Sequence, residues 1–497
     1  MINFSLLVLI LSLIAFCVKC NEFKKIENAH NLIENEFTDL HSKHSVYKRA
    51  ILRNLQKNWT SPILFYVQPG LSKYRHIISA TVRSLSELTC LQFNESSTSI
   101  ENNIGIVFAY NIQHCQSNLG RFSNVKNSHI FLSHACAKRS GIIMHELLHA
   151  LGMKHEHTRY DRDHYVAIFD KYLINNPSVV SGIHTKDDTN IVATFNDIPY
   201  DYGSIMHYPR VAFVKFLGYE FHGKFNSIEA KNIYLYTLML GQRERLSFSD
   251  VKTLNYYYCS DKCKDSMIQC KNGGYKNYDE RLCGRCVCPK GYYGNDCSKV
   301  KPLSEKCSEV DLTAGYSYKV IGEEGNKNCN YRIKAEQNKT IHLVLFANTK
   351  QKRICASGIG LEVKYLKNKG VTGLCICGNY DDIHIVSESD EVYIEYNGLR
   401  RSDRFHAFYA LAPSDQENSI ICDKDSCYEK KGNYYEKVNK SYKMFEYGLV
   451  PDDYPIIGKP EYSSEEHLGS SEEDYSTNNT ITPEESIEIE EENDIKE

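Results

Sequence analysis

The first half of the chain alternates short apolar runs with one amphipathic segment. Residues 62–68 (PILFYVQ) are rich in β-branched and aromatic side chains and predict a strand. Residues 72–89 carry apolar side chains at helical spacing and predict a helix. Its expected apolar face consists of Ile77, Val82, Leu85 and Leu88. Further strands are predicted to begin at Cys90 and to cover residues 107–110 and 129–133. Together these elements predict an α+β domain, in which a twisted sheet packs against two helices.

The second of these helices carries the most informative pattern in the chain. The sequence HELLHALGMKHEHTRYDRD, residues 145–163, contains the pattern H-E-x-x-H-x-x-G-x-x-H. His145 and His149 are four residues apart, so a helix presents both on one face. Gly152 tolerates the left-handed conformation that ends a helix, and the chain can then bring His155 back towards the first two histidines.

These residue types at this spacing predict a catalytic zinc site holding one ion per chain. Three neutral imidazole nitrogens leave a fourth position open for water, as catalytic zinc requires. Glu146 lies beside the first ligand and is the natural base for that water. The alternative is an amphipathic core helix whose histidines are merely hydrogen-bonded. The apolar residues between the histidines suit either interpretation.

A second motif follows at residues 200–208, YDYGSIMHY. A methionine turn downstream of the extended zinc motif is typical of the metzincin peptidases. With HEHTR beginning at the third histidine of the zinc motif, the segment from about Ala50 to Cys259 resembles the astacin family. The resemblance implies that Met206 packs beneath the zinc and that Tyr208 reaches the metal and stabilises an oxyanion. Because the chain has 36 tyrosines, the role of Tyr208 comes from the resemblance alone.

The same resemblance carries further expectations for this domain, residues 50–260. It implies that the segment just before the zinc helix is the edge strand along which a substrate lies, where main-chain pairing gives affinity with little sequence demand. It implies that Glu156 meets the N-terminal ammonium group of Ala50 after activation, the alternative being a surface acid on a charged loop. It also implies two disulfides, Cys90–Cys259 and Cys115–Cys136.

The N-terminus predicts export and activation by cleavage. Residues 4–18 (FSLLVLILSLIAFCV) are too short for a comfortable membrane span, so residues 1–20 are interpreted as a signal peptide, the alternative being a membrane anchor. Residues 21–49 are interpreted as a propeptide. Cleavage is expected after Arg49, at the distance from Trp59 that astacins show, with Arg53 as the competing site. Asp39, in an incomplete form of the propeptide motif of the family, is the candidate blocking carboxylate.

The composition of the chain changes after the first domain, because residues 261–298 contain six cysteines. The C-x-C pair and the final C-P-x-G-Y-x-G-x-x-C resemble an EGF-like module. Six cysteines alone allow 15 pairings, so the pairing comes from the resemblance. The implied disulfides are Cys263–Cys283, Cys270–Cys286 and Cys288–Cys297.

Residues 307–412 alternate strand-like runs with turns and predict a β-sandwich. The strands are expected at residues 316–321, 331–334, 341–346, 361–365, 392–396 and 405–409. The cysteine placement resembles a CUB domain and implies the pair Cys307–Cys329, followed by Cys355 with either Cys375 or Cys377. After removal of the signal peptide 17 of the 19 cysteines remain, so one is free or joins another chain. Cys422 and Cys427 are candidates for a further pair.

The end of the chain, residues 413–497, is polar and acidic, and we expect it to be largely disordered.

The net charge of −4 gives no bulk basic surface for nucleic acid, and no later run of about 20 apolar residues predicts a membrane span. Nineteen cysteines favour an oxidising compartment. Five glycosylation sequons are present, at Asn58, Asn94, Asn338, Asn439 and Asn478.

The complete prediction is a secreted zinc metalloendopeptidase, made as a zymogen, that hydrolyses extracellular proteins. Its fold is a metzincin domain with a mixed sheet and a zinc helix, then an EGF-like module, a CUB β-sandwich and a disordered acidic tail. The EGF-like and CUB modules are expected to bind substrates, matrix or protein partners. The alternative is a catalytically silent binding protein that acts through these modules. The natural substrate, the biological process and the oligomeric state stay open at this stage, because fold-level analogy does not select a substrate.

Overall fold

A computed structural model describes most of the chain between Trp59 and Asn439. The described residues are 59–101, 103–112, 115–121, 126–186, 198–215, 225–300, 304, 307, 310–352, 354–412, 418–423, 426–432 and 434–439. The predicted signal peptide, propeptide and cleavage site lie outside these ranges, as does the end of the chain from residue 440. Five of the predicted site residues also lie outside them: Asp39, Arg49, Ala50, Asn58 and Asn478.

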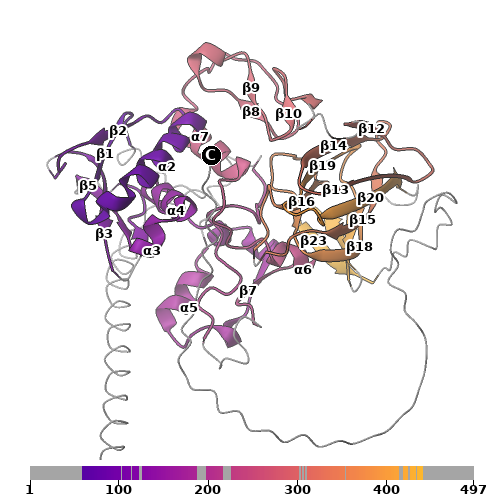
Figure 1. Cartoon of the computed structure of the whole chain (residues 1–497), viewed down its shortest axis with the longest axis horizontal. Coiled ribbons are helices and arrows are strands. Elements are labelled where there is room, and N and C mark those ends of the chain that lie inside the picture. Colours follow the sequence, from indigo (N-terminus) through magenta and orange to yellow (C-terminus); the bar gives the residue numbers. More distant parts are fainter. Residues whose placement is uncertain are drawn as a thin grey trace, which may run out of the picture. The chain divides into compact units, whose positions relative to one another are not determined.

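The first sheet has five strands in the order β2-β1-β3-β5-β4. Strands β1, β2, β3 and β5 are labelled in Figure 1. Its strands are β1 (Ile63–Val67), β2 (Phe93–Ser96), β3 (Gly105–Tyr110), β4 (Gln116–Ser117) and β5 (Asn127–Leu132). All neighbours are parallel except β4, which runs antiparallel to β5. The predicted mixed sheet is therefore confirmed. The segment before the zinc helix, β5, is not the outermost strand that was expected, because the two-residue β4, too short to leave a sequence signal, pairs with its residues Ile130 and Phe131.

Helices pack against this sheet through one hydrophobic core. They are η2 (Pro69–Tyr74), α2 (Arg75–Leu88), α3 (His134–Ala137) and α4 (Ser140–Ala150). The predicted helix over residues 72–89 is confirmed in α2, but its buried face differs in detail. Val82 and Leu85 are buried together with Ile78, while Leu88 is 48% exposed. Positions 78, 82 and 85 have the four- and three-residue spacing of one helical stripe, whereas Leu88 ends the helix.

Short elements build the part of the domain that follows the zinc helix. They are η3 (Glu156–Thr158), η4 (Arg162–His164), β6 (Val166–Ile168), η5 (Asp170–Tyr172), α5 (Pro177–His184), β7 (Ile228–Ala230), α6 (Tyr234–Thr237) and α7 (Phe248–Cys259). Strands β6 and β7 pair antiparallel. Helix α7 begins with a capping box, in which Ser247 and Asp250 satisfy each other's backbone amides.

The predicted disulfides agree with the structure. Those in the first domain are Cys90–Cys259 and Cys115–Cys136, and those in the following segment are Cys263–Cys283, Cys270–Cys286 and Cys288–Cys297. This segment contains little regular structure: η8 (Glu280–Leu282) and two small sheets, β8 (Tyr275–Lys276) with β9 (Cys286–Val287) and β10 (Tyr292–Tyr293) with β11 (Lys299–Val300). Its three disulfides compensate for a core too small to stabilise it alone.

The C-terminal region forms two further sheets. One has the order β12-β14-β19-β16-β17, with β12 (Asp311–Thr313), β14 (Asn328–Lys334), β19 (Glu391–Asn397), β16 (Gly360–Lys364) and β17 (Leu374–Ile376). The other begins β13-β20-β15-β18, with β13 (Lys319–Glu324), β20 (Arg404–Leu411), β15 (Ile341–Asn348) and β18 (Asn379–Val386). Cys307 pairs with Cys329 as predicted, and Cys355 pairs with Cys377, so Cys375 is the thiol left over.

The second of these sheets continues into the segment that the sequence assigned to the tail. Strands β21 (Ile420–Cys422), β22 (Cys427–Lys431) and β23 (Tyr434–Val438) extend it beyond β18. The prediction that the disordered tail begins at residue 413 was therefore wrong for these strands. The Cys422–Cys427 disulfide closes the hairpin between β21 and β22, and Ile420 and Ile421 are buried, which stabilises a segment whose composition is otherwise polar.

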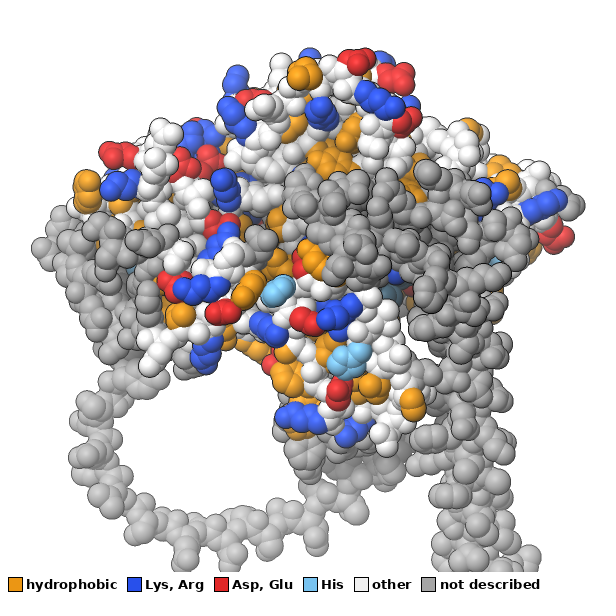
Figure 2. All heavy atoms as spheres, turned by 180° about the vertical axis from the view of Figure 1, so that it is seen from behind, with side chains coloured by type: hydrophobic (Ala, Val, Ile, Leu, Met, Phe, Trp, Pro, Cys, Tyr) orange, Lys and Arg blue, Asp and Glu red, His pale blue; other side chains and the backbone are white. Residues whose placement is uncertain are grey.

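The surface of the described part carries charges of both signs. On the face seen in Figure 2, basic and acidic side chains are interspersed. Among the described residues, no helix is long and apolar enough to cross a membrane. The described sequon residues Asn94, Asn338 and Asn439 are all exposed.

Candidate active site and metal centre

Helix α4 and the turn after it bring the three predicted histidines together. His145, Glu146 and His149 lie on α4, which ends at Ala150. Gly152 has φ of +93°, the left-handed conformation that the motif predicts, and its amide donates to the His149 carbonyl at 2.7 Å. The chain reverses there and brings His155 back, so that one nitrogen from each histidine lies within 4.8 Å of the others.

Hydrogen bonds to carbonyl groups fix the orientation of two of these rings. The Nδ1 atom of His145 donates to the Ile205 carbonyl at 2.9 Å, and that of His149 donates to the Met153 carbonyl at 2.7 Å. Because each Nδ1 carries its proton, each Nε2 presents a lone pair. The Nε2 atoms of His149 and His155 are 3.1 Å apart. This separation is close to that of two ligand nitrogens on one tetrahedral ion with metal–nitrogen bonds of about 2.0–2.1 Å, so the donor set fits a metal ion.

Burial keeps the three imidazoles neutral, as metal binding requires. It lowers the pKa of His149 to about 4 and holds the pKa values of His145 and His155 well below their usual range. Among the described residues no fourth side chain joins this cluster, and three neutral nitrogens with an open fourth position make up the ligand set of a catalytic zinc site.

Two further predicted residues flank the histidines. Glu146 is 6% exposed, and burial raises the pKa of its carboxyl group to about 7, an effect that the nearby Arg243 cation opposes. The ring of Tyr208 lies against His155, with 4.2 Å between ring centroids. Burial raises the pKa of the Tyr208 phenol to about 12, so this hydroxyl group stays protonated at neutral pH and can donate a hydrogen bond.

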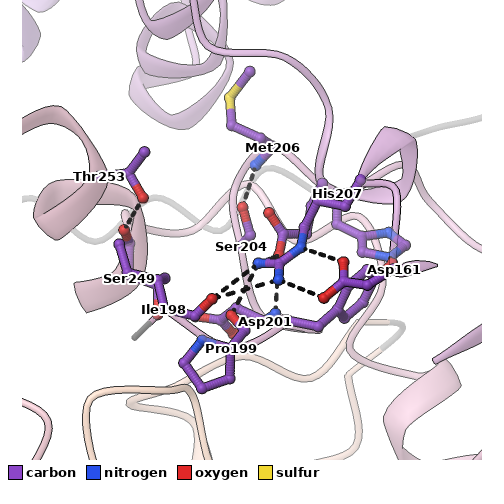
Figure 3. A network of polar contacts seen from close by, with 12 residues as sticks. Asp161, Ile198, Pro199, Asp201, Ser204, Met206, His207, Ser249 and Thr253 are labelled. Atoms are coloured by element: carbon purple, nitrogen blue, oxygen red, sulfur yellow. Dashed lines mark hydrogen bonds and ion pairs between the residues drawn. The ribbon is translucent and has the colours of Figure 1, made fainter. Parts of the chain in front are cut away.

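The predicted methionine turn passes beside the zinc helix. Met206 is fully buried in the core that contains Leu147, Leu148 and Leu151 of the zinc helix and its end. Its amide donates to the Ser204 hydroxyl at 3.0 Å, a contact drawn in Figure 3, and its carbonyl accepts from the Glu156 amide at 3.0 Å. The turn is therefore tied to the loop that carries His155.

The comparison with known proteins agrees with this geometry. Residues 51–259 match the model of the peptidase family named Astacin. This part of the chain belongs to the astacin family. The cluster of His145, His149 and His155 fits the zinc site of this family, and the predicted cofactor is confirmed.

Relatives of the astacin domain and its C-terminal neighbours occur among nematode proteins. The chain is 30% identical over 370 residues to zinc metalloproteinase nas-34 of Caenorhabditis elegans, a match covering 74% of this chain and 58% of the relative. It is 34% identical over 295 residues to zinc metalloproteinase dpy-31 of Brugia malayi, covering 58% of this chain and 46% of the relative. The chain thus spans about half the length of these curated relatives.

A solved structure also resembles the astacin domain. It is high choriolytic enzyme 1, a hatching enzyme zinc-protease from the medaka fish Oryzias latipes. It is 30% identical, and the match covers 43% of this chain and 94% of that chain with a TM-score of 0.33.

Within the astacin domain, Glu156 is buried rather than exposed on a charged loop. Its Oε1 atom accepts from Arg159 at 3.1 Å and from the Asp201 amide at 3.0 Å. The guanidinium group of Arg159 is held in turn by Asp161 and by the carbonyls of Ile198 and Pro199, three residues that are labelled in Figure 3. Burial raises the pKa of Glu156 to about 7, and the Arg159 cation opposes this effect. The Ala50 partner that the resemblance implies lies outside the described residues.

Several residues of the astacin domain that support the site carried no clear sequence signal. Trp59 donates from Nε1 to the carbonyl of Ala150, the last residue of the zinc helix, at 2.7 Å. His207 is fully buried between the Tyr200 hydroxyl and the Tyr208 carbonyl, each 2.7 Å away, so it is structural and not a ligand. Only Asp250 had a local signal, because Ser247 three residues before it forms a capping box.

Proposed function

We propose that this chain is a secreted, zinc-dependent metalloendopeptidase that hydrolyses peptide bonds of extracellular proteins. The observation that carries the proposal is the convergence of three neutral imidazole nitrogens beside a buried carboxyl group and a protonated phenol. A zinc ion held by His145, His149 and His155 supplies the Lewis acid that polarises a peptide carbonyl and acidifies a water molecule. The chain's own residues perform the proton transfers.

Glu146 acts as the general base and then as the general acid. A general base works best when its pKa lies near the operating pH, and the pKa of about 7 of Glu146 meets this condition. Its carboxylate takes a proton from the attacking water and then gives it to the leaving amine. The position next to His145 on α4 places the carboxyl group beside the metal site without making it a ligand.

Tyr208 stabilises the negative charge that develops on the carbonyl oxygen. Its hydroxyl group stays protonated because burial raises the pKa of the phenol to about 12. Among the described residues this hydroxyl group has no hydrogen-bond acceptor, so it is available to the substrate. Donors aimed at developing charge contribute roughly 10²- to 10³-fold to the rate of acyl transfer enzymes.

The zymogen part of the proposal rests on Glu156. Both of its hydrogen bonds within the described part of the chain go to Oε1, which leaves Oε2 as the acceptor for an ammonium group. A buried carboxylate needs a partner, and cleavage after Arg49 creates one at Ala50. Asp39 is proposed as the carboxylate that blocks the metal before cleavage.

The segments after the astacin domain are proposed as binding modules. The disulfide order first–third, second–fourth and fifth–sixth within residues 261–298 supports an EGF-like module. The two sheets over residues 307–412 support a CUB β-sandwich. The eight disulfides among the described residues support secretion. The exposed Asn94, Asn338 and Asn439 are the proposed glycosylation sites.

The decisive experiment measures cleavage of gelatin and casein by the secreted chain. It compares protein before and after processing at Arg49, with and without a zinc chelator. The central variant is Glu146→Gln, which keeps the size of the side chain but removes the base. The matched control is Glu87→Gln, the same change at an exposed position of α2.

We expect activity only in processed, zinc-loaded protein. Glu146→Gln should lower the rate at least about 100-fold, as the loss of general acid–base catalysis does, and Glu87→Gln should leave it unchanged. If correctly processed, zinc-loaded protein cleaves neither these substrates nor a panel of extracellular proteins, the endopeptidase proposal fails. The chain would then be a binding protein that acts through its C-terminal modules.

A further inference from the structure

His157 occupies an unfavourable environment for an imidazole. It lies in the short helix η3, directly after Glu156, and is 1% exposed. Neither Nδ1 nor Nε2 has a hydrogen-bond partner among the residues that the structure describes. Buried polar groups without partners are rare and call for an explanation, because their lost hydration is not replaced. The nitrogens of His157 therefore do not account for its presence.

The face of the ring does have a partner. The His157 ring stacks on the ring of Tyr208, with centroids 4.0 Å apart and an interplanar angle of 27°. Among the described residues Tyr208 has two other ring neighbours, His155 at 4.2 Å and 57° and Phe213 at 5.7 Å and 65°. Of the three, His157 is the nearest and the most nearly parallel to the phenol ring.

The backbone that carries His157 is fixed from several sides. The buried Arg162 donates to the His157 carbonyl at 3.0 Å. On one side of His157 the Glu156 amide donates to the Met206 carbonyl at 3.0 Å, and on the other the Thr158 hydroxyl donates to the His155 carbonyl at 2.7 Å. The backbone on both sides of the His157 ring is therefore tied to the methionine turn, to Arg162 and to the third histidine of the zinc motif.

We propose that His157 is a positioning residue for Tyr208. The flat face of its imidazole fixes the plane of the phenol ring, and thereby the direction in which the hydroxyl group points. This inference rests on the proposed function, in which that hydroxyl group meets the oxyanion. A tyrosine hydroxyl stands at the end of a long side chain with two torsions, so a small rotation of an unsupported ring moves the oxygen far from its acceptor. Small misplacements of catalytic groups cost up to about 100-fold in rate.

In this proposal the flat face of the His157 ring, and not its nitrogens, positions Tyr208. Two substitutions separate the contribution of the ring face from that of the nitrogens. His157→Phe keeps a flat ring and removes both nitrogens. His157→Leu keeps a buried apolar side chain and removes the ring. Both are made in the full-length, processed, zinc-loaded protein, and zinc content and melting temperature are measured first to show that each variant is folded and loaded.

The kinetic expectation is a separation of kcat from KM. His157→Leu should lower kcat roughly tenfold or more with KM within about twofold, because Tyr208 acts in the transition state and not in substrate binding. His157→Phe should restore kcat to within about threefold of the unchanged chain, since ring stacking survives. If His157→Phe loses as much as His157→Leu, the nitrogens are responsible and the proposal is overturned.

A double-mutant cycle tests whether His157 acts through Tyr208. In a Tyr208→Phe background, which lacks the hydroxyl group, His157→Leu should change kcat by less than about twofold, because coupled residues are not additive. An undiminished loss in that background would mean that His157 supports the site in another way, and would overturn the proposal.

A measurement without substrate keeps this inference separate from the proposed function. 3-Fluorotyrosine placed at position 208 alone gives a single reporter for ¹⁹F NMR. We expect one sharp environment in the unchanged chain and in His157→Phe, and a broadened or multiple signal in His157→Leu. Identical spectra in all three proteins would refute the positioning role. If the unchanged chain cleaves nothing, the proposed function fails while these spectra still decide whether His157 orders Tyr208.

Discussion

The hydroxyl group of Ser204 donates to the carboxylate of Asp250 at 2.6 Å, and both residues are buried. The two are 46 residues apart in the chain. The same carboxylate accepts from the amides of Ile205 at 3.0 Å and Ser247 at 2.9 Å. The Ile205 carbonyl in turn accepts from Nδ1 of His145 at 2.9 Å. A short series of hydrogen bonds therefore links the start of α7 to a zinc ligand through the methionine turn.

This link predicts that Asp250→Ala weakens both folding and metal binding. Removing the carboxylate leaves three buried donors without their acceptor, and we expect a loss of roughly 3 kcal/mol in the free energy of unfolding. Zinc affinity should fall as well, because the orientation of His145 depends on the turn. Chemical denaturation and zinc titration check the two effects. Asp265→Ala, the same change at an exposed position, is the control, and equal behaviour of the two variants would contradict the prediction.

A second prediction concerns acid sensitivity and His207. Burial lowers the pKa of this imidazole from its usual 6.5 to about 4. The folded state therefore holds His207 neutral, while the unfolded chain protonates it below pH 6.5. The contribution of the neutral His207 to the free energy of unfolding is complete above pH 6.5. It is lost as the pH falls from 6.5 through 4, by up to about 3 kcal/mol.

The measurement compares the zinc-free unchanged chain with His207→Gln between pH 7 and pH 4. The variant is less stable at pH 7, and we expect the difference in unfolding free energy to shrink as the pH falls. His76→Gln, at an exposed position of α2, serves as the control for a histidine change without burial. A difference between His207→Gln and the unchanged chain that stays constant over this range would show that His207 does not titrate with folding.

The sequence predicted the residues whose role depends on local spacing. His145 and His149 are one helical turn apart, and Gly152 adopts the positive φ that the motif requires. His155 lies in the segment that turns back after Gly152. Helix geometry alone places these groups. Tyr208 could be assigned only through the family resemblance, since nothing local distinguishes it from the other tyrosines.

The residues that the sequence did not reveal depend on contacts between distant segments. Two of the partners of Asp250 lie 45 and 46 residues away, and Trp59 meets Ala150 across 91 residues. The stacking of His157 on Tyr208 depends on the angle between two loops, which no periodicity encodes. The strands β21 to β23 were missed for a similar reason, because a polar edge strand is stabilised by pairing and by a disulfide rather than by an apolar pattern.

A third prediction compares two disulfides of very different span. Cys90 and Cys259 are 169 residues apart, whereas Cys422 and Cys427 are five apart. In the chain-entropy model the first should contribute about 5 kcal/mol and the second about 2 kcal/mol to stability. Replacing each pair by alanine and measuring the free energy of unfolding tests this difference. An equal loss from both replacements would show that loop length does not set the contribution here.

The last prediction concerns Cys375, which the odd number of cysteines left either free or joined to another chain. It lies in β17, is fully buried, and is the free thiol among the described residues. Burial holds the pKa of this thiol well above its usual range, so it forms little reactive thiolate. We expect the processed protein to run as a monomer on a non-reducing denaturing gel. A maleimide should label one thiol per chain after unfolding in denaturant and none in the native protein. Cys375→Ala should abolish the labelling. A covalent dimer that disappears in this variant would show instead that Cys375 joins two chains.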